Sequence, residues 1–111
     1  MRTVTLENQS IELDDEGYLL ELDQWTPALA EYLAKEENIL LTPAHWEILT
    51  VIRDFYHQYE LSPAMRPLVK AVGLALGSDK GKSIYLMKLF PESPAKQAAK
   101  LAGLPKPTNC L

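Results

Sequence analysis

The chain has 111 residues, 47% of them hydrophobic, and a formal net charge of −4. This length supports one domain with a buried core and leaves no room for a second. No apolar run approaches the ~18–20 residues that span a bilayer, and the first residues do not resemble an export signal. A single cysteine is typical of a protein in a reducing compartment, so we expect a cytoplasmic protein with no membrane partner.

The first twenty residues predict a small β-meander. Segments 3–6 and 10–13 alternate polar and apolar residues on either side of positions 8–9, and segment 18–20 follows a turn-like stretch at 15–17. Alternation with a period of two, bounded by turn residues, is the pattern of half-buried strands. We therefore expect three short antiparallel strands.

A repeated capping pattern marks helix starts further along the chain. Each copy places a hydroxyl residue before a proline and an alanine: Thr26-Pro27-Ala28, Thr42-Pro43-Ala44, Ser62-Pro63-Ala64 and Ser93-Pro94-Ala95. The hydroxyl satisfies an orphan amide, and a proline at the first helical position has no amide to satisfy. Together with helical apolar spacing, the pattern predicts helices over 27–36, 43–59, 63–76 and 94–102, and segment 79–90 predicts one more.

These elements predict an α+β fold that is mostly helical, with the small N-terminal β-meander packed against an array of about five helices. We expect a single domain over residues 1–102. Gly103 ends the last predicted helix, and Pro105 and Pro107 follow it, which favours an extended chain. We therefore expect residues 103–111 to form a mobile C-terminal arm that carries the only cysteine, Cys110.

The position of Cys110 predicts an accessible thiol, because chain ends are the least tied-down part of a domain. A free cysteine has a pKa near ~8.5, so only about 3% is thiolate at neutral pH. No second thiol is present for a dithiol redox cycle. The chemistry that fits is transfer, in which Cys110 takes the outer sulfur of a donor persulfide and passes it on. The alternative is an inert cysteine.

The charge is divided unevenly along the chain. Residues 1–60 hold 3 Lys and Arg against 13 Asp and Glu, whereas residues 61–111 hold 8 against 2, which gives balances of −10 and +6. A bipolar surface of this kind could steer an acidic partner or hold a persulfide anion. The alternative is that the two halves attract each other within the fold.

Other motifs point to no metal or organic cofactor. The two histidines, His45 and His57, have no cysteine pair beside them, so a zinc site is not expected. The lysine-containing segment 77–82 lacks the spacing of a phosphate-binding loop. The second and third predicted helices superficially resemble a helix-turn-helix with Arg66 and Lys70 on its recognition helix, although an acidic domain neutralises DNA phosphates poorly. A regulatory protein that binds nucleic acid through these two helices is the alternative function from another class.

The chain resembles the DsrC/TusE family of bacterial sulfur-relay proteins over nearly its whole length. The segments that carry the resemblance are Tyr18-Leu19, 41–47, 53–56, 62–66, 68–71, 80–83, 89–91, 94–98 and 102–107, followed by Cys110. The resemblance implies a small meander sheet on a helical array, and it implies that Cys110 carries the sulfur. The DsrC branch has a second cysteine at the position of Ala99, so the resemblance favours the TusE branch over a DsrC-like carrier in sulfur oxidation or sulfite reduction.

For the TusE branch, the resemblance implies that sulfur comes from a TusBCD complex and goes to the tRNA 2-thiouridylase MnmA for thiolation of the wobble uridine. The protein would then be a sulfurtransferase that acts with partners and reaches tRNA indirectly. We expect a set of basic residues to stabilise the persulfide or to dock an acidic partner. This set is Arg66, Lys70, Lys80, Lys82 and Lys106.

Overall fold

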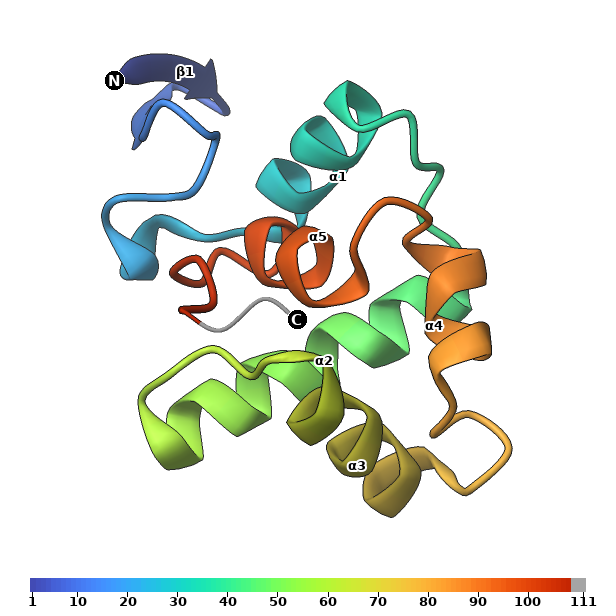
Figure 1. Ribbon diagram of the computed structural model, residues 1–111. Coiled ribbons are helices and arrows are strands. Elements are labelled where there is room, and N and C mark those ends of the chain that lie inside the picture. The colour runs from blue at the N-terminus through green and yellow to red at the C-terminus, as the bar shows by residue number, and fades with distance from the viewer. Residues whose placement is uncertain (109–111) are drawn as a thin grey trace.

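The structure is a computed structural model, and it describes residues 1–108 (Figure 1). It has the predicted α+β architecture, in which a two-stranded antiparallel sheet lies beside five α-helices. The elements are β1 (Arg2–Leu6), β2 (Gln9–Leu13), a 3-10 helix (Leu22–Gln24), α1 (Pro27–Glu36), α2 (Pro43–Tyr59), α3 (Met65–Leu76), α4 (Ser83–Leu89) and α5 (Pro94–Leu101). Within residues 1–108, every helix is too short or too polar to cross a membrane.

The N-terminal sheet has two strands, and the predicted third strand over 18–20 is not formed. It is reduced to one bridge between Leu13 and Leu19. The side chain of Asp14 accepts hydrogen bonds from the amides of Glu16 and Tyr18, both at 2.9 Å. This side-chain turn competes with strand pairing, so the chain curls toward the helices after β2.

Three of the four predicted proline starts are confirmed, since α1, α2 and α5 begin at Pro27, Pro43 and Pro94. Thr26 caps α1 as expected, because its side chain accepts a hydrogen bond from the amide of Leu29 at 3.2 Å. The third start is shifted, since α3 begins at residue 65 and not at residue 63. Ser62, the predicted cap, instead donates its hydroxyl to the carbonyl of Pro105 in the C-terminal segment.

His45 closes the start of α2 and ties it to the end of α4. Its Nδ1 accepts a hydrogen bond from the amide of Thr42 at 3.1 Å, so Nε2 carries the proton and donates to the carbonyl of Leu89 at 2.9 Å. The imidazole also meets the ring of Phe90 edge-on, with ring centroids 5.3 Å apart. This histidine is therefore a capping and packing residue.

The helix predicted over 79–90 is shorter in the structure. α4 starts at residue 83 because the preceding residues form a turn, in which the amide of Gly81 donates to the carbonyl of Gly77 at 3.1 Å. Leu86 and the following Phe90 are buried, whereas Ile84 and Met87 are exposed. Only one side of this short helix therefore reaches the core.

Helix α5 lies at the centre of the array and contacts each of the other four helices (Figure 1). Its buried residues are mostly small: Pro94, Ala95, Gln97, Ala98, Ala99 and Leu101. Alanine side chains let neighbouring helices approach closely on several sides. The last turn of α5, from which the C-terminal segment departs, is consequently fixed by the whole core.

A close backbone contact between Gly73 of α3 and Gly81 gives an asymmetric pair of expected results. A β-carbon on Gly81 would overlap the Cα of Gly73 and lie 2.7 Å from its amide nitrogen, whereas a β-carbon on Gly73 would lie 3.6 Å from the Cα of Gly81. We expect Gly81→Ala to lower the free energy of unfolding by about 1–3 kcal/mol, because backbone atoms must move. Gly73→Ala should raise it by about 0.5–1 kcal/mol through helix propensity.

Urea denaturation of the two variants measures both changes. Because the substitutions are identical and the sites are in contact, each variant is the control for the other. Equal effects in the two variants would contradict the close approach of this loop to α3.

Candidate functional site

The C-terminal segment leaves α5 through a left-handed glycine. Gly103 has φ +73°, and its amide donates to the carbonyl of Lys100 at 3.1 Å, while the amide of Leu104 donates to the carbonyl of Ala99 at 2.9 Å. This arrangement satisfies the last carbonyls of the helix and reverses the chain. Leu104 is only 2% exposed, so the segment re-enters the core before it reaches the surface.

Two side chains from distant elements complete the end of α5. The indole Nε1 of Trp25 donates to the carbonyl of Leu101 at 2.9 Å, and Nη1 of Arg53 donates to the carbonyl of Ala102 at 2.7 Å. The guanidinium of Arg53 also lies 3.9 Å from the centre of the Trp25 ring. Burial lowers the pKa of Arg53, and the nearby charge of Asp54 only partly offsets this effect. The base of the C-terminal segment is thus held by a stacked pair of side chains.

The next residues of the segment are held from two further sides. The hydroxyl of Ser62, in the link between α2 and α3, donates to the carbonyl of Pro105 at 2.5 Å. The amine of Lys106 pairs with the carboxylate of Glu16 at 2.8 Å, and Pro107 is buried. We call residues 103–107 the stem. The stem is packed on the domain, and the predicted boundary at residue 103 stays a prediction.

Cys110, the predicted catalytic residue, lies outside the described residues 1–108. The stem leads to this cysteine and is the described part of the candidate site. A groove of about 360 Å³ opens beside the stem. Its lining residues are Leu22, Asp23, Arg53, Tyr56, His57, Glu60 and Leu104.

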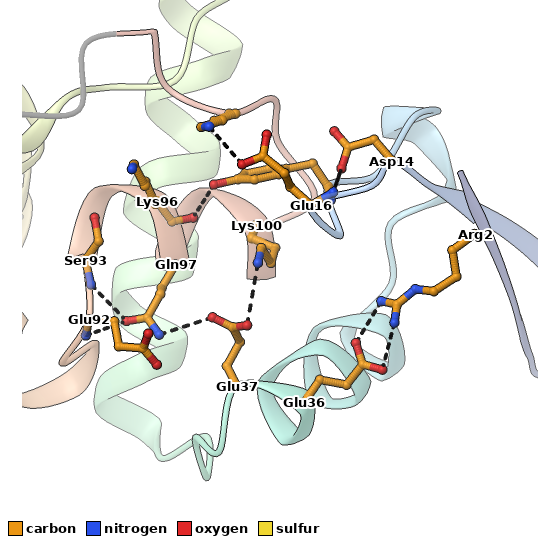
Figure 2. A network of polar contacts seen from close by, with 12 residues as sticks. Arg2, Asp14, Glu16, Glu36, Glu37, Glu92, Ser93, Lys96, Gln97 and Lys100 are labelled. Carbon is orange, nitrogen blue, oxygen red and sulfur yellow. Dashed lines mark hydrogen bonds and ion pairs between the residues drawn. The ribbon is translucent and has the colours of Figure 1, made fainter.

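A polar network joins α5 to the end of α1 and to the turn after β2 (Figure 2). The buried side chain of Gln97 donates to Glu37 at 3.2 Å, and Lys100 pairs with the same carboxylate at 3.5 Å. Tyr18 donates to the carbonyl of Lys96 at 3.3 Å. The Tyr18 contact ties α5 to the turn after β2, which supplies the Glu16 partner of the stem. Within the part of the chain that is described, no group of three metal-ligating side chains occurs.

The five predicted basic residues do not share one environment. Lys106 pairs with Glu16, and Lys80 pairs with Glu47 at 2.8 Å, a hydrogen bond that raises the pKa of the Lys80 amine. Both pairs join the basic half of the sequence to the acidic half, as does the Lys100–Glu37 pair. Part of the uneven charge is therefore used inside the fold. The remaining three are exposed and, within residues 1–108, have no carboxylate partner: Arg66, Lys70 and Lys82.

Next to Lys70, an apolar groove of about 400 Å³ runs between α2 and α3. Leu74 is 81% exposed and Tyr59 is 53% exposed, and the ring of Tyr59 lies 4.6 Å from that of Phe55. A monomeric protein exposes few apolar clusters of this kind unless they contact a partner. The two helices of the superficial helix-turn-helix thus present apolar as well as basic groups.

The residues around the stem were not predicted as site residues from the sequence. Ser62 was predicted to be a helix cap and Glu16 to lie in a turn-like stretch. Their roles depend on long-range packing, and a hydroxyl before a proline gives no signal that separates a cap from a donor to a distant carbonyl.

Comparisons with known proteins place this geometry among sulfur-relay proteins. The family model described as DsrC like protein matches residues 5–111. The chain is 57% identical over 101 residues to the sulfurtransferase TusE homolog of Haemophilus influenzae, covering 91% of this chain and 93% of that protein. It is 52% identical over 105 residues to the sulfurtransferase TusE of Escherichia coli K12, covering 95% and 96% respectively.

Solved structures agree with the fold. DsrC of Allochromatium vinosum superposes with a TM-score of 0.90 at 48% identity, covering 98% of this chain and 97% of that chain. The oxidized γ-subunit of the dissimilatory sulfite reductase from Archaeoglobus fulgidus superposes with a TM-score of 0.85 at 36% identity, covering 99% and 100% respectively. The predicted resemblance is thereby confirmed in both sequence and structure.

Proposed function

The chain belongs to the DsrC-like family and is a sulfurtransferase of the sulfur-relay type, and from this we propose that Cys110 is its sulfur-carrying residue. Cys110 receives sulfur from a TusBCD-like donor and delivers it to an MnmA-like tRNA 2-thiouridylase in the cytoplasm. The observation that carries the proposal is the nearly full-length identity to sulfurtransferases named TusE, together with a family match that includes the only cysteine.

The transfer step needs one thiol at this protein and no external oxidant. The thiolate of Cys110 attacks the outer sulfur of the donor's cysteine persulfide. A new S–S bond forms at Cys110, the donor's S–S bond breaks, and its electron pair leaves with the donor cysteine as thiolate. The proton released by Cys110 balances the one that the donor thiolate takes up. The persulfide on Cys110 then passes its outer sulfur to the acceptor cysteine by the same exchange.

A DsrC-like role in sulfur oxidation or sulfite reduction is disfavoured by position 99. The family resemblance places the second cysteine of the DsrC branch there, and this chain has Ala99, which is fully buried in α5. Without that thiol the chain cannot close an internal disulfide with Cys110. A relay that uses a single persulfide remains the chemistry available to it.

We place the donor-binding surface on α3 and the loop that follows it. Arg66, Lys70 and Lys82 are exposed, and Lys70 lines the apolar groove between α2 and α3. An acidic surface with apolar side chains would satisfy both features. Lys80 and Lys106 have smaller parts in this proposal, because each already pairs with a carboxylate of its own chain.

Replacing both Arg66 and Lys70 by alanine is expected to weaken donor binding about tenfold at low salt, since exposed charges act mainly on association rate and are screened by ions. The matched control is the double replacement of Lys35 and Lys88, which are exposed on α1 and α4. Surface plasmon resonance at two salt concentrations measures both. If both double variants weakened donor binding equally, the donor-binding surface would not lie on α3.

Intact-mass spectrometry tests the proposed function itself. After incubation with a persulfide-loaded donor, the wild-type chain should gain the mass of one sulfur atom, and a reductant should remove it. A chain that gains no mass, while its thiol still reacts with an alkylating reagent, would contradict the proposal. The family resemblance would then describe the fold, and the regulatory nucleic-acid-binding alternative would come first.

A further inference from the structure

Two side-chain contacts to neighbouring stem residues come from elements that lie far apart in the sequence. Ser62 donates its hydroxyl to the carbonyl of Pro105, and Glu16 accepts from the amine of Lys106, the next residue. Ser62 lies in the link between α2 and α3 and is 8% exposed, whereas Glu16 lies in the turn after β2. Two consecutive stem residues are thus fixed to two elements that are far apart in the sequence.

We propose that Glu16 and Ser62 are positioning residues that clamp the stem and thereby limit how far Cys110 can reach. This inference rests on the proposed role of Cys110 as the sulfur carrier. The clamp would let a partner take sulfur only when it docks close to the stem, unless the partner also opens the clamp.

Covalent geometry sets the size of the effect. An extended chain spans at most ~3.3–3.6 Å per residue, so Cys110 can lie no further than about 14 Å from Lys106 while the clamp holds. If the clamp opens and the stem detaches back to the buried Leu104, six residues separate the anchor from Cys110, and the limit becomes about 22 Å. Releasing the clamp therefore extends the reach by about half and dilutes the thiol over a larger volume.

The contacts of the stem differ in how easily they open. Proline has no amide donor, so Pro105 and Pro107 donate no backbone hydrogen bond to the rest of the domain. The Lys106 and Glu16 side chains are 41% and 59% exposed, which makes this ion pair weak and sensitive to salt. Leu104 is buried deeper. Residues 105–107, the outer part of the stem, should consequently detach from the domain before Gly103 and Leu104 do.

The test uses NMR on the full chain, with Ser62→Ala, Glu16→Gln and the two combined. In the wild type, the backbone amide of Lys106 should have an order parameter near ~0.85, as in rigid backbone, and in the combined variant it should fall below ~0.6. The released population should rise about 5- to 10-fold for Ser62→Ala and about 2- to 5-fold for Glu16→Gln. Added salt should loosen the wild type and leave Glu16→Gln unchanged, which a merely structural effect would not do.

Ser78→Ala and Glu12→Gln are the matched controls, because both residues are exposed. A nitroxide on Cys110 reports the reach: in the combined variant, paramagnetic broadening should spread to amides beyond the stem's surroundings. An unchanged order parameter at Lys106 in the combined variant would overturn the clamp. If the combined variant fails to fold, the order parameter of the Lys106 amide in Glu16→Gln, a substitution at an exposed site, provides the same test.

These measurements need no sulfur donor, so they separate the clamp from the proposed function. A clamp that opens as expected, in a chain that gains no sulfur mass, would leave the positioning residues established and Cys110 without a relay role. A chain that gains sulfur, with a stem equally ordered in all variants, would leave the relay intact and remove the clamp.

Discussion

Replacing Cys110 by serine is expected to abolish sulfur delivery completely in a reconstituted assay with donor, acceptor and tRNA. A serine hydroxyl is almost the same size as the thiol but has no sulfur to form a persulfide, and it is essentially un-ionised at neutral pH. The chain carries no other cysteine that could substitute. Mass spectrometry of the tRNA for 2-thiouridine gives the readout, and the loss should be total and not partial.

Thr108→Ser, a conservative change in the same segment, is the control and should retain full activity. Thermal unfolding of the wild type and both variants checks that the fold is retained, and Thr108→Ser should leave it unchanged because Thr108 is exposed. If Cys110→Ser still supports tRNA thiolation, another group carries the sulfur. If the protein instead binds nucleic acid equally well with and without this thiol, the regulatory alternative is favoured.

Local sequence patterns predicted most of the helices. Pro27, Pro43 and Pro94 are first helical residues in the structure as they are in the prediction, because capping and proline preferences act over one turn of chain. The prediction at Pro63 was two residues early, because a hydroxyl has more than one available partner. Ser62 donates to Pro105, and only the folded arrangement brings those two residues together.

The third predicted strand is not formed and the fourth helix is shorter than predicted, for related reasons. Segment 18–20 has the composition of a strand, but the carboxylate of Asp14 accepts hydrogen bonds from two backbone amides, and the chain turns there. Residues 79–82 have helical spacing, but the contact between Gly73 and Gly81 requires a turn there. In both places a specific tertiary contact competes with a general propensity, and the contact prevails.

The candidate site was predictable in its chemistry more than in its geometry. A lone thiol near proline residues suggested transfer, and the family resemblance agrees with that chemistry. The charge asymmetry left open that the two halves of the chain attract each other within the fold, but it did not reveal that Lys80 and Lys106 are among the residues that pair. Ion pairs between distant residues depend on the fold, so counting charges along the sequence overestimates what is free for a partner.

Gly103→Ala is expected to be the most disruptive single change at the base of the stem. A β-carbon there would overlap Cδ1 of Trp25 and lie 2.7 Å from its Cγ, and the backbone has φ +73°. The left-handed conformation costs an alanine about 1–2 kcal/mol, and overpacking against the indole adds about 1–3 kcal/mol. Displacing Trp25 would also disturb its bond to Leu101 and its stacking with Arg53.

Gly77→Ala separates the two contributions, because Gly77 also has a positive φ, +107°, but a β-carbon there meets no atom within 4 Å. Urea denaturation followed by tryptophan fluorescence should give a larger loss of stability for Gly103→Ala than for Gly77→Ala. It should also show an altered native-state signal for Gly103→Ala alone, because Trp25 moves. Equal losses of stability would mean that moving the Trp25 indole costs no free energy. The stem would then be positioned by the contacts of Pro105 and Lys106 and not by the packing at its base.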